Sequence, residues 1–191
     1  MKISIEKTRI EDVLFVHPEA FRDDRGFFME VYREDVWREA GLDMRFVQFN
    51  HSGSVKDVVR GLHFQWEPPM GKLMRVTRGA AFLVAVDVRP GSPTLGEWVG
   101  RVMTADKAEQ FWAPAGCARG FGVLSDYAEV QYLTTGTYSN KAESGVLWCD
   151  PRIGIEWPVA TPILSDKDAK AQTLDQWLAR PEAQAFALKA R

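Results

Sequence analysis

The chain has 191 residues, a size that fits one domain or one domain followed by a tail. Apolar residues make up 46% of it, with 11 Phe and 7 Trp among them, so a hydrophobic core can form without stabilising disulfides or metal ions. The net charge of -2 excludes a general attraction to nucleic acid or anionic lipid, and an anionic ligand would therefore need a local cluster of Arg and Lys.

The N-terminus, "MKISIEKTRI", lacks the continuous apolar segment of a signal peptide. No apolar run in the chain reaches the ~20 residues that a membrane span needs. The two cysteines, Cys117 and Cys149, lack CxxC spacing and do not suggest a disulfide framework. We therefore expect a cytoplasmic protein with neither a membrane nor a nucleic acid as partner.

Most of the chain has the sequence pattern of short β-strands. "REDVWREAG" (33–41) predicts a short helix that ends at Gly41, and β-branched and apolar runs separated by turn residues follow it. The run 80–89 predicts a strand covered on both faces, and 97–104 alternates like a half-buried strand. In chain order, the expected strands are 72–79, 80–89, 97–104, 109–114, 120–125 and 128–138.

Turn signals recur at intervals typical of an antiparallel sandwich or barrel. The last 25 residues are Ala-rich, have helix-forming composition and are interrupted by Pro181. We expect an all-β, antiparallel jelly-roll barrel of the cupin type with short peripheral helices. The barrel would span residues 1–168, and residues 169–191 would form a tail with one or two short helices.

The stretch "RGLHFQWEPPMGKLMR" (60–75) holds His63, one of three histidines in the chain. Cupin barrels often bind a metal through a His-x-His pair, a later Glu and a His on a second hairpin. Here Gln65 follows at i+2, no Glu stands three or four residues beyond it, and Arg119 replaces the last histidine. An amide is a poor transition-metal ligand and a guanidinium cannot ligate, so the sequence argues against a metal site.

A hydrogen-bonded core histidine is the ordinary alternative for His63. Arg60 and Lys72 stand in the same stretch, and both are costly to bury without a counter-charge. A cavity that holds these cations suits an anionic ligand, so we favour a functional His63 over a purely structural one.

Eight blocks of the sequence resemble, in order and spacing, the dTDP-4-dehydrorhamnose 3,5-epimerase family. They cover about residues 10–168 and read "FRDDRGFFMEVY", "FVQFNHS", "RGLHFQ", "GKLMRV", "VAVDVRPGSPTLGEW", "APAGCARGFGVLSD", "DPRIGIEWP" and "LSDKD". The resemblance implies a jelly roll, a homodimer and no metal or other cofactor. It also implies a nucleotide-sugar substrate, dTDP-4-dehydro-6-deoxy-D-glucose, inverted at C3 and C5 to prepare the rhamnose donor for surface polysaccharide.

The 4-keto group of such a sugar acidifies the hydrogens on C3 and C5. Epimerisation then needs a base on one face, an acid on the other and a positive charge near the enolate oxygen. The resemblance makes His63 the base and Asp168 the carboxylate that fixes its tautomer. Tyr132 matches the acid, because a phenol keeps its proton at neutral pH. Lys72 matches the cation beside the enolate oxygen.

Further positions match the family's contacts to the nucleotide sugar. Arg60 suits a diphosphate because its planar fork can bond two oxygens, and Tyr138 matches the aromatic ring that stacks on the base. The family's N-terminal segment reaches the partner subunit, which would place Arg25 and Glu30 at the neighbouring site. The matched binding residues are Arg25, Glu30, Gln48, Asn50, Arg60, Tyr138, Glu143 and Lys167.

Arg119 is the main departure from the family pattern, which usually has a His here. Arg cannot relay a proton and is larger. Three alternatives stay open: Arg119 binds the phosphates of the usual substrate, the nucleotide or sugar differs, or a single carbon is inverted. A non-catalytic nucleotide-sugar binding module on the same barrel is a further hypothesis, and a metal-dependent cupin oxygenase is the remaining one.

Overall fold

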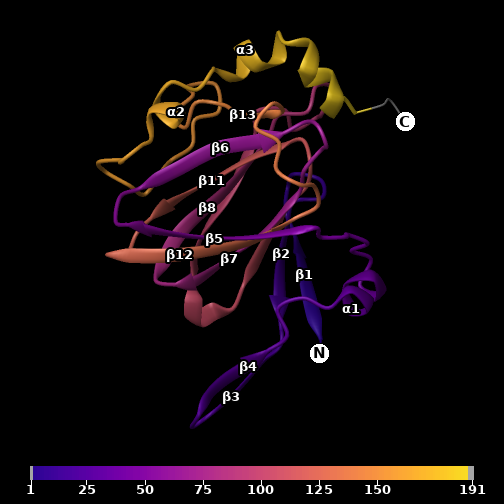
Figure 1. Ribbon diagram of the computed structural model, residues 1–191, viewed down its shortest axis with the longest axis vertical. Helices are drawn as coiled ribbons and strands as arrows, with labels where there is room; N and C mark the ends of the chain where they lie inside the picture. The colour runs from indigo at the N-terminus through magenta and orange to yellow at the C-terminus, as the bar shows by residue number, and fades with distance from the viewer. Residues whose placement is uncertain (1, 189–191) are drawn as a thin grey trace.

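The computed structural model describes residues 2–188, and within them two antiparallel sheets pack face to face (Figure 1). The six-stranded sheet has the order β1-β2-β10-β7-β12-β5, and the five-stranded sheet has the order β13-β6-β11-β8-β9. The first sheet contains β1 (Ile3–Lys7), β2 (Leu14–Pro18), β5 (Gln48–Val55), β7 (Lys72–Arg78), β10 (Gln110–Ala113) and β12 (Tyr127–Thr134). The second contains β6 (Val59–Gln65), β8 (Ala80–Asp87), β9 (Trp98–Thr104), β11 (Cys117–Val123) and β13 (Glu143–Gly145). The predicted all-β, cupin-like jelly roll is confirmed.

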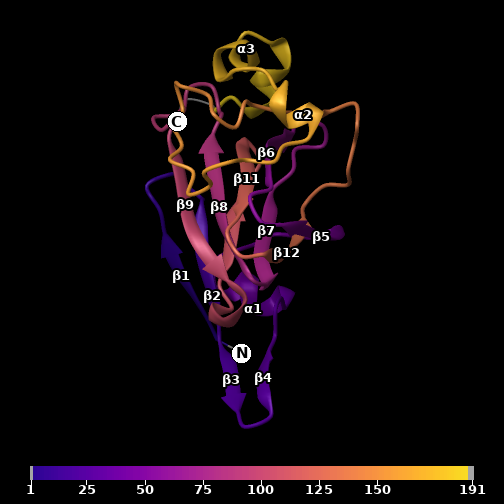
Figure 2. The ribbon, with the colours of Figure 1, turned by 90° about the vertical axis from the view of Figure 1, so that its left-hand side faces the viewer.

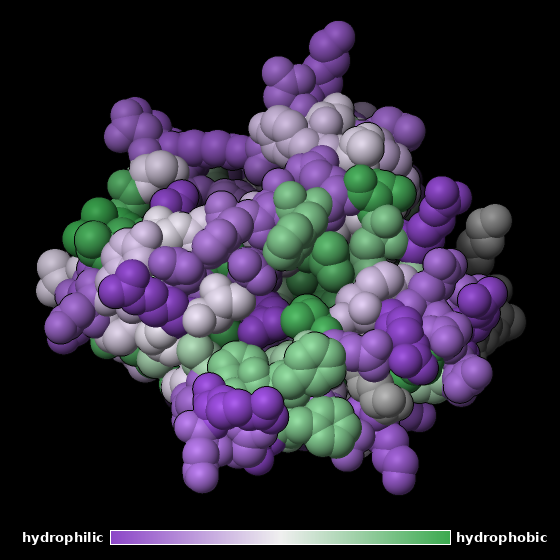
Figure 3. Space-filling view, turned by 60° about the horizontal axis from the view of Figure 1, so that its bottom comes forward, coloured by the Kyte–Doolittle hydropathy of each residue, from purple (hydrophilic) through white to green (hydrophobic). Residues whose placement is uncertain are grey.

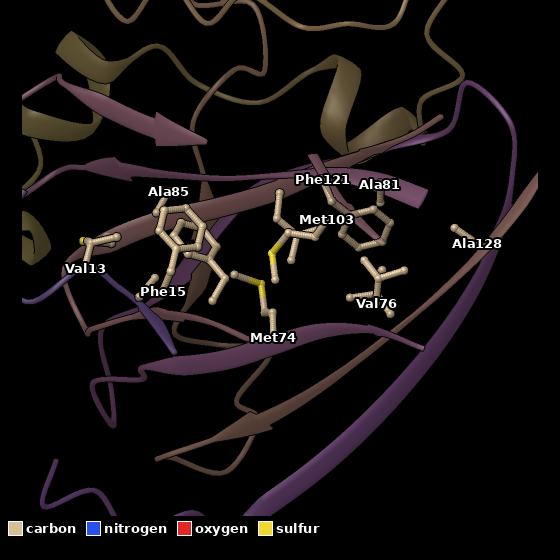
Figure 4. Close-up of a cluster of buried hydrophobic side chains, with 14 of the residues drawn as sticks. Val13, Phe15, Met74, Val76, Ala81, Ala85, Met103, Phe121 and Ala128 are labelled. Carbon is tan, nitrogen blue, oxygen red and sulfur yellow. The ribbon is translucent and has the colours of Figure 1, made fainter. Parts of the chain in front are cut away.

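The main hydrophobic core lies between the two sheets (Figure 4). Met74 and Val76 of the six-stranded sheet contribute to it, and Ala81, Leu83 and Ala85 of β8 contribute from the other side. The intervening residues of β8 point the opposite way and join a second core. Because side chains alternate along a strand, β8 is buried on both faces, as its apolar run predicted.

The C-terminal segment covers the outer face of the five-stranded sheet. It contains α2 (Asp166–Ala169), α3 (Leu174–Leu178) and a 3₁₀ helix that begins at Pro181 and ends at Phe186. The fully buried Trp177 of α3 lies 4.4 Å, between ring centroids, from Phe64 of β6. Figure 2 shows these helices lying across one end of the sheet. The predicted short helices are present, the domain boundary at residue 168 stays a prediction, and the end of the predicted tail, 189–191, lies outside the described residues.

Two N-terminal elements lie outside the two main sheets. The helix α1 (Glu34–Glu39) confirms the predicted helix and packs Trp37 against the outer face of the six-stranded sheet. The hairpin of β3 (Ala20–Asp23) and β4 (Gly26–Met29) forms a separate two-stranded sheet that projects away from the molecule (Figures 1 and 2). This hairpin and the strands β1, β2, β5, β6 and β13 were not predicted from the sequence.

Some predicted strand bounds were wrong. The strand predicted at 120–125 is β11 and begins at Cys117, so Arg119 lies within the strand and not in the preceding turn. The strand predicted to reach residue 138 ends at Thr134. The alternation expected in 97–104 is not observed, because most of β9 is partly exposed at this sheet edge.

Candidate active site

A pocket of about 390 Å³ lies between the two sheets. On its six-stranded side the lining follows a period of two residues, as expected for the inner face of paired strands. The structure brings nine of the thirteen predicted site residues to its lining. They are Gln48, Asn50, Arg60, His63, Lys72, Arg119, Tyr132, Tyr138 and Glu143.

An irregularity in the pairing of β6 explains how Arg60 and His63 both line this pocket. Strict alternation would send residues three apart to opposite faces, but the register with β11 shifts between them. Gly61 lies at this shift with φ of 127°, and a Cβ on it would stand 2.7 Å from the Cα of Gly120. Glycine at both positions allows the two strands to approach, so "RGLH" brings a cation and an imidazole to one pocket.

His63 is paired with a carboxylate from the far end of the chain. Its Nε2 lies 2.6 Å from Oδ1 of Asp168, which is 4% exposed although its flanking residues are exposed. The hydroxyl of Ser165, the N-cap of α2, accepts a hydrogen bond from the backbone N–H of Asp168. Burial raises the pKa of Asp168, but the hydrogen bond and the charge of His63 outweigh burial, and the net pKa is lowered. Asp168 is therefore held as a carboxylate against the imidazole.

Lys72 and Tyr132 lie on neighbouring strands of the opposite sheet. The Nζ of Lys72 is 5.0 Å from the centroid of the Tyr132 ring. Burial first, and the positive charge of Arg119 second, lower the pKa of Lys72 to about 7. Burial raises the pKa of Tyr132, so its phenol keeps its proton at neutral pH. The pocket thus has an imidazole on one sheet and a protonated phenol on the other.

A chain of polar contacts closes the pocket beside His63. The hydroxyl of Tyr138 donates to Oε2 of Glu143 at 3.0 Å, and Lys167 forms an ion pair with the same oxygen. Burial raises the pKa of Glu143, but Lys167 outweighs burial and the net pKa is lowered. Behind these residues a second cavity of about 310 Å³ is lined by His63, Glu143, Lys167 and Asp168. Lys167 and Asp168 therefore adjoin the pocket from behind it.

The remaining predicted residues divide into two groups. Gln48 and Asn50 line the pocket from β5, where Gln48 donates to Asn50, and Arg60 lines it from β6 and donates to the hydroxyl of Ser54 at 3.0 Å. Arg25 and Glu30 do not line it; they lie on or beside the projecting hairpin, where Arg25 pairs with Asp23.

Two structural contributors were not predicted as such. Ser165 caps the helix that carries Asp168, and the spacing S-x-x-D is the signal that could have identified it. The buried Gln65, considered only as a poor metal ligand, donates to the carbonyls of Pro68 and Thr137 and accepts from the N–H of Ser139. It anchors the loop that presents Tyr138.

Within residues 2–188, no three or more His, Cys, Asp or Glu side chains are grouped as metal ligands. In the same part of the chain, no helix combines the length and apolar character that a membrane crossing requires.

Comparisons with known proteins agree with this geometry. The family model described as dTDP-4-dehydrorhamnose 3,5-epimerase matches residues 7–176. A curated dTDP-4-dehydrorhamnose 3,5-epimerase of Shigella flexneri is 52% identical over 89% of this chain and 95% of its own, and one of Escherichia coli is 49% identical over 91% and 96%. The crystal structure of dTDP-6-deoxy-D-glucose-3,5-epimerase from Legionella pneumophila, in complex with dTDP-4-keto-L-rhamnose, is 39% identical. It aligns with a TM-score of 0.92 over 99% of this chain and all of the other.

Proposed function

The chain belongs to the dTDP-4-dehydrorhamnose 3,5-epimerase family and is an epimerase that acts on a dTDP-linked 4-keto-6-deoxyhexose at C3 and C5, and we propose that His63, Asp168, Tyr132 and Lys72 carry out its chemistry. The observation that carries this assignment is the 2.6 Å contact between His63 and Asp168 at the wall of a pocket whose opposite sheet holds Tyr132. It supports a base and an acid on opposite faces of a bound sugar.

The reaction follows from these positions. The ring nitrogen of His63 that does not face Asp168 takes the hydrogen from the carbon beside the ketone, and Asp168 stabilises the resulting imidazolium. The electron pair moves onto the ketone oxygen, where Lys72 supplies a positive charge to the enolate. Tyr132 then delivers its proton to the other face of the same carbon, which inverts the centre.

The other residues of the pocket hold the substrate. Arg60 suits the diphosphate, and its contact with Ser54 fixes the guanidinium at the pocket wall. Tyr138 is 57% exposed, so one face of its ring is available for stacking with the base. Gln48 accepts from the backbone N–H of Tyr138 at 2.9 Å and links the sugar side of the pocket to this ring.

This function can be tested by incubating the protein with dTDP-4-dehydro-6-deoxy-D-glucose in deuterated water and following the C3 and C5 hydrogen signals by proton NMR. We expect deuterium at both carbons. Deuterium at a single carbon would reduce the activity to a mono-epimerase, and binding of the nucleotide without exchange would leave only a binding module.

We further propose that two copies form a dimer in which each hairpin reaches the other copy's pocket. The hairpin projects from its own barrel (Figure 1). Its residues Phe21, Phe27 and Phe28 have exposed fractions of 54%, 56% and 66%. The molecule viewed toward this end presents hydrophobic side chains gathered between hydrophilic ones (Figure 3). Burial of such a surface favours association, and it would bring Arg25 and Glu30 to a site that they do not reach within one chain.

Mixing two inactive variants tests this arrangement. In a dimer of His63→Asn with Arg25→Ala, one pocket lacks both residues and the other has both. We expect a one-to-one mixture, after subunit exchange, to recover about a quarter of the wild-type activity, because half the dimers then hold one intact site. If Arg25 serves its own pocket, the mixture stays inactive.

A further inference from the structure

Arg119 is a buried guanidinium whose hydrogen bonds go to backbone carbonyls. The residue is 3% exposed. Its Nη2 donates to the carbonyl of Met70 and to the carbonyl of Pro114, the latter at 2.9 Å. Its Nη1 makes a longer contact of 3.4 Å with the carbonyl of His63. Within residues 2–188 no carboxylate forms an ion pair with it, so its charge is compensated by carbonyl dipoles.

These contacts leave Arg119 poorly placed to bind phosphate. Both hydrogens of Nη2 are used, and Nε is buried with no partner in the described part of the chain. A bidentate grip on a phosphate needs two neighbouring N–H groups that point at the ligand. The pocket offers Arg60 for that purpose, since it is an exposed residue whose Nε donates to the hydroxyl of Ser54.

The carbonyls that Arg119 binds belong to the segments that carry the reacting groups. His63 is directly opposite Arg119 in the pairing of β6 with β11. Met70 lies two residues before Lys72, and Pro114 leads into β11 itself. One rigid side chain therefore joins the backbone under the base to the backbone that begins the strand of Lys72.

The positive charge of Arg119 also acts on Lys72 across the pocket. After burial, Arg119 is the largest cause of the lowered Lys72 pKa. Lys167 lowers this pKa further and Glu143 raises it. The ring of Tyr132 also lies beside the amine, and His63 and Arg60 line the same pocket.

We propose that Arg119 is a positioning residue for the epimerisation: it fixes the backbone of His63 and Met70 and holds a positive charge near Lys72 without contacting the substrate. This inference depends on the proposed function for its kinetic consequences. It gives this chain a fixed cation in the pocket wall, bonded to the backbone, in addition to the cations that face the ligand.

Two substitutions separate these roles. Arg119→Lys keeps the charge with fewer donors, and Arg119→Gln keeps amide donors without the charge. We expect both to bind dTDP within about threefold of the wild type in calorimetry while kcat falls about tenfold or more, since the residue acts on the transition state and not on nucleotide binding. Arg60→Gln is the matched control and should weaken dTDP binding by about tenfold or more.

The titration of Lys72 provides a measurement that does not depend on activity. Reductive ¹³C-methylation followed by NMR against pH reports each lysine, and Lys72→Arg assigns the signal. We expect Lys72 to titrate near 7 in the wild type and in Arg119→Lys, and about one unit higher in Arg119→Gln, which lacks the repelling charge.

Three results would overturn the proposal: loss of dTDP affinity in the Arg119 variants equal to that of Arg60→Gln, an unchanged kcat, or a Lys72 titration that is the same in the wild type and Arg119→Gln. A wild-type titration near the ordinary lysine value would also overturn it, even if the variants fail to fold. If the wild type gives no deuterium exchange, the proposed function fails, whereas dTDP affinity and the lysine titration still decide the inference.

Discussion

The ammonium group of Lys72 lies over the ring of Tyr132, 5.0 Å from its centroid, and the two residues come from adjacent strands of one sheet. The acid of the proposed reaction and the cation that stabilises its enolate thus share one corner of the pocket. Once Tyr132 has given up its proton, the phenolate and the ammonium attract each other directly. The charge state of Lys72 therefore influences both negative charges that the reaction creates, on the enolate and on the phenolate.

This relationship predicts a pH dependence. Lys72 has a pKa of about 7, lowered by burial and by Arg119, so the ammonium form is lost as the pH rises through 7. We expect kcat/KM, which reports the free enzyme, to decrease above pH 7. Lys72→Arg keeps its charge and should move this decrease to higher pH, whereas Lys72→Met should lose activity at every pH. A wild-type profile that stays flat to pH 9 would contradict this prediction.

Substitution of the base should separate binding from chemistry. We expect His63→Ala to abolish deuterium exchange at C3 and C5 while dTDP affinity stays within about tenfold, because the base is not a main binding group. His63→Asn is the companion variant, since it retains a donor for the buried Asp168. A His63 variant that keeps most of its exchange rate would show that another residue is the base.

Tyr132→Phe should impair reprotonation more than deprotonation. His63 can still remove the hydrogen and return a solvent-derived one to the same face, so label exchange should outlast inversion. We would use substrate deuterated at C3 and C5 and compare loss of label with formation of inverted product by NMR. Equal loss of both rates would place the defect before proton delivery, and unchanged turnover would remove Tyr132 from the acid role.

Asp168→Asn should reduce kcat by about tenfold or more, because the imidazolium loses its carboxylate and the tautomer is no longer fixed. The stability of the variant should also respond differently to pH. The pKa of Asp168 is lower in the folded chain than its ordinary value of 3.8, so this carboxylate stabilises the fold above that value, and the contribution is lost as pH falls through the folded pKa. Denaturant unfolding at pH 7 and pH 3 should show a wild-type advantage that shrinks at the lower pH.

The contribution of the C-terminal segment can be measured at Trp177. Its side chain is fully buried against Phe64 and Phe186, so Trp177→Ala should lower the free energy of unfolding by about 3–5 kcal/mol. Gln184→Ala, at an exposed position of the same segment, should change it by less than about 0.5 kcal/mol. Equal stability of the two variants would mean that this segment does not share the core of the barrel.

Local patterns in the sequence were enough to predict β8, α1 and the jelly roll, because an apolar run and a helix closed by Gly41 are short-range signals. They were not enough for β5, whose sequence "QFNHSGSV" is polar and contains glycine, so its alternation was overlooked. The start of β11 was also missed, since "PAGCA" contains the residues of a turn.

The family resemblance predicted the site residues and the pairing of His63 with Asp168, but not how the fold brings them together. Nothing local connects His63 with Asp168, which lie 105 residues apart and meet only once α2 is placed behind β6. The same limit applies to Arg119. The sequence showed that an Arg replaces the usual His at this position. Its burial and its carbonyl partners could not be predicted, because they depend on three segments that only the fold brings together.

The late position of Asp168 has a consequence for synthesis of the protein on the ribosome. Every strand within residues 2–188 precedes residue 166, and Asp168, the carboxylate that pairs with His63, belongs to the helix after them. A nascent chain released between Gly145 and Ser165 would carry the imidazole, the phenol and the lysine of the pocket but no partner for His63. Catalytic activity therefore requires that translation continue past the barrel strands, because Asp168 is synthesised after them.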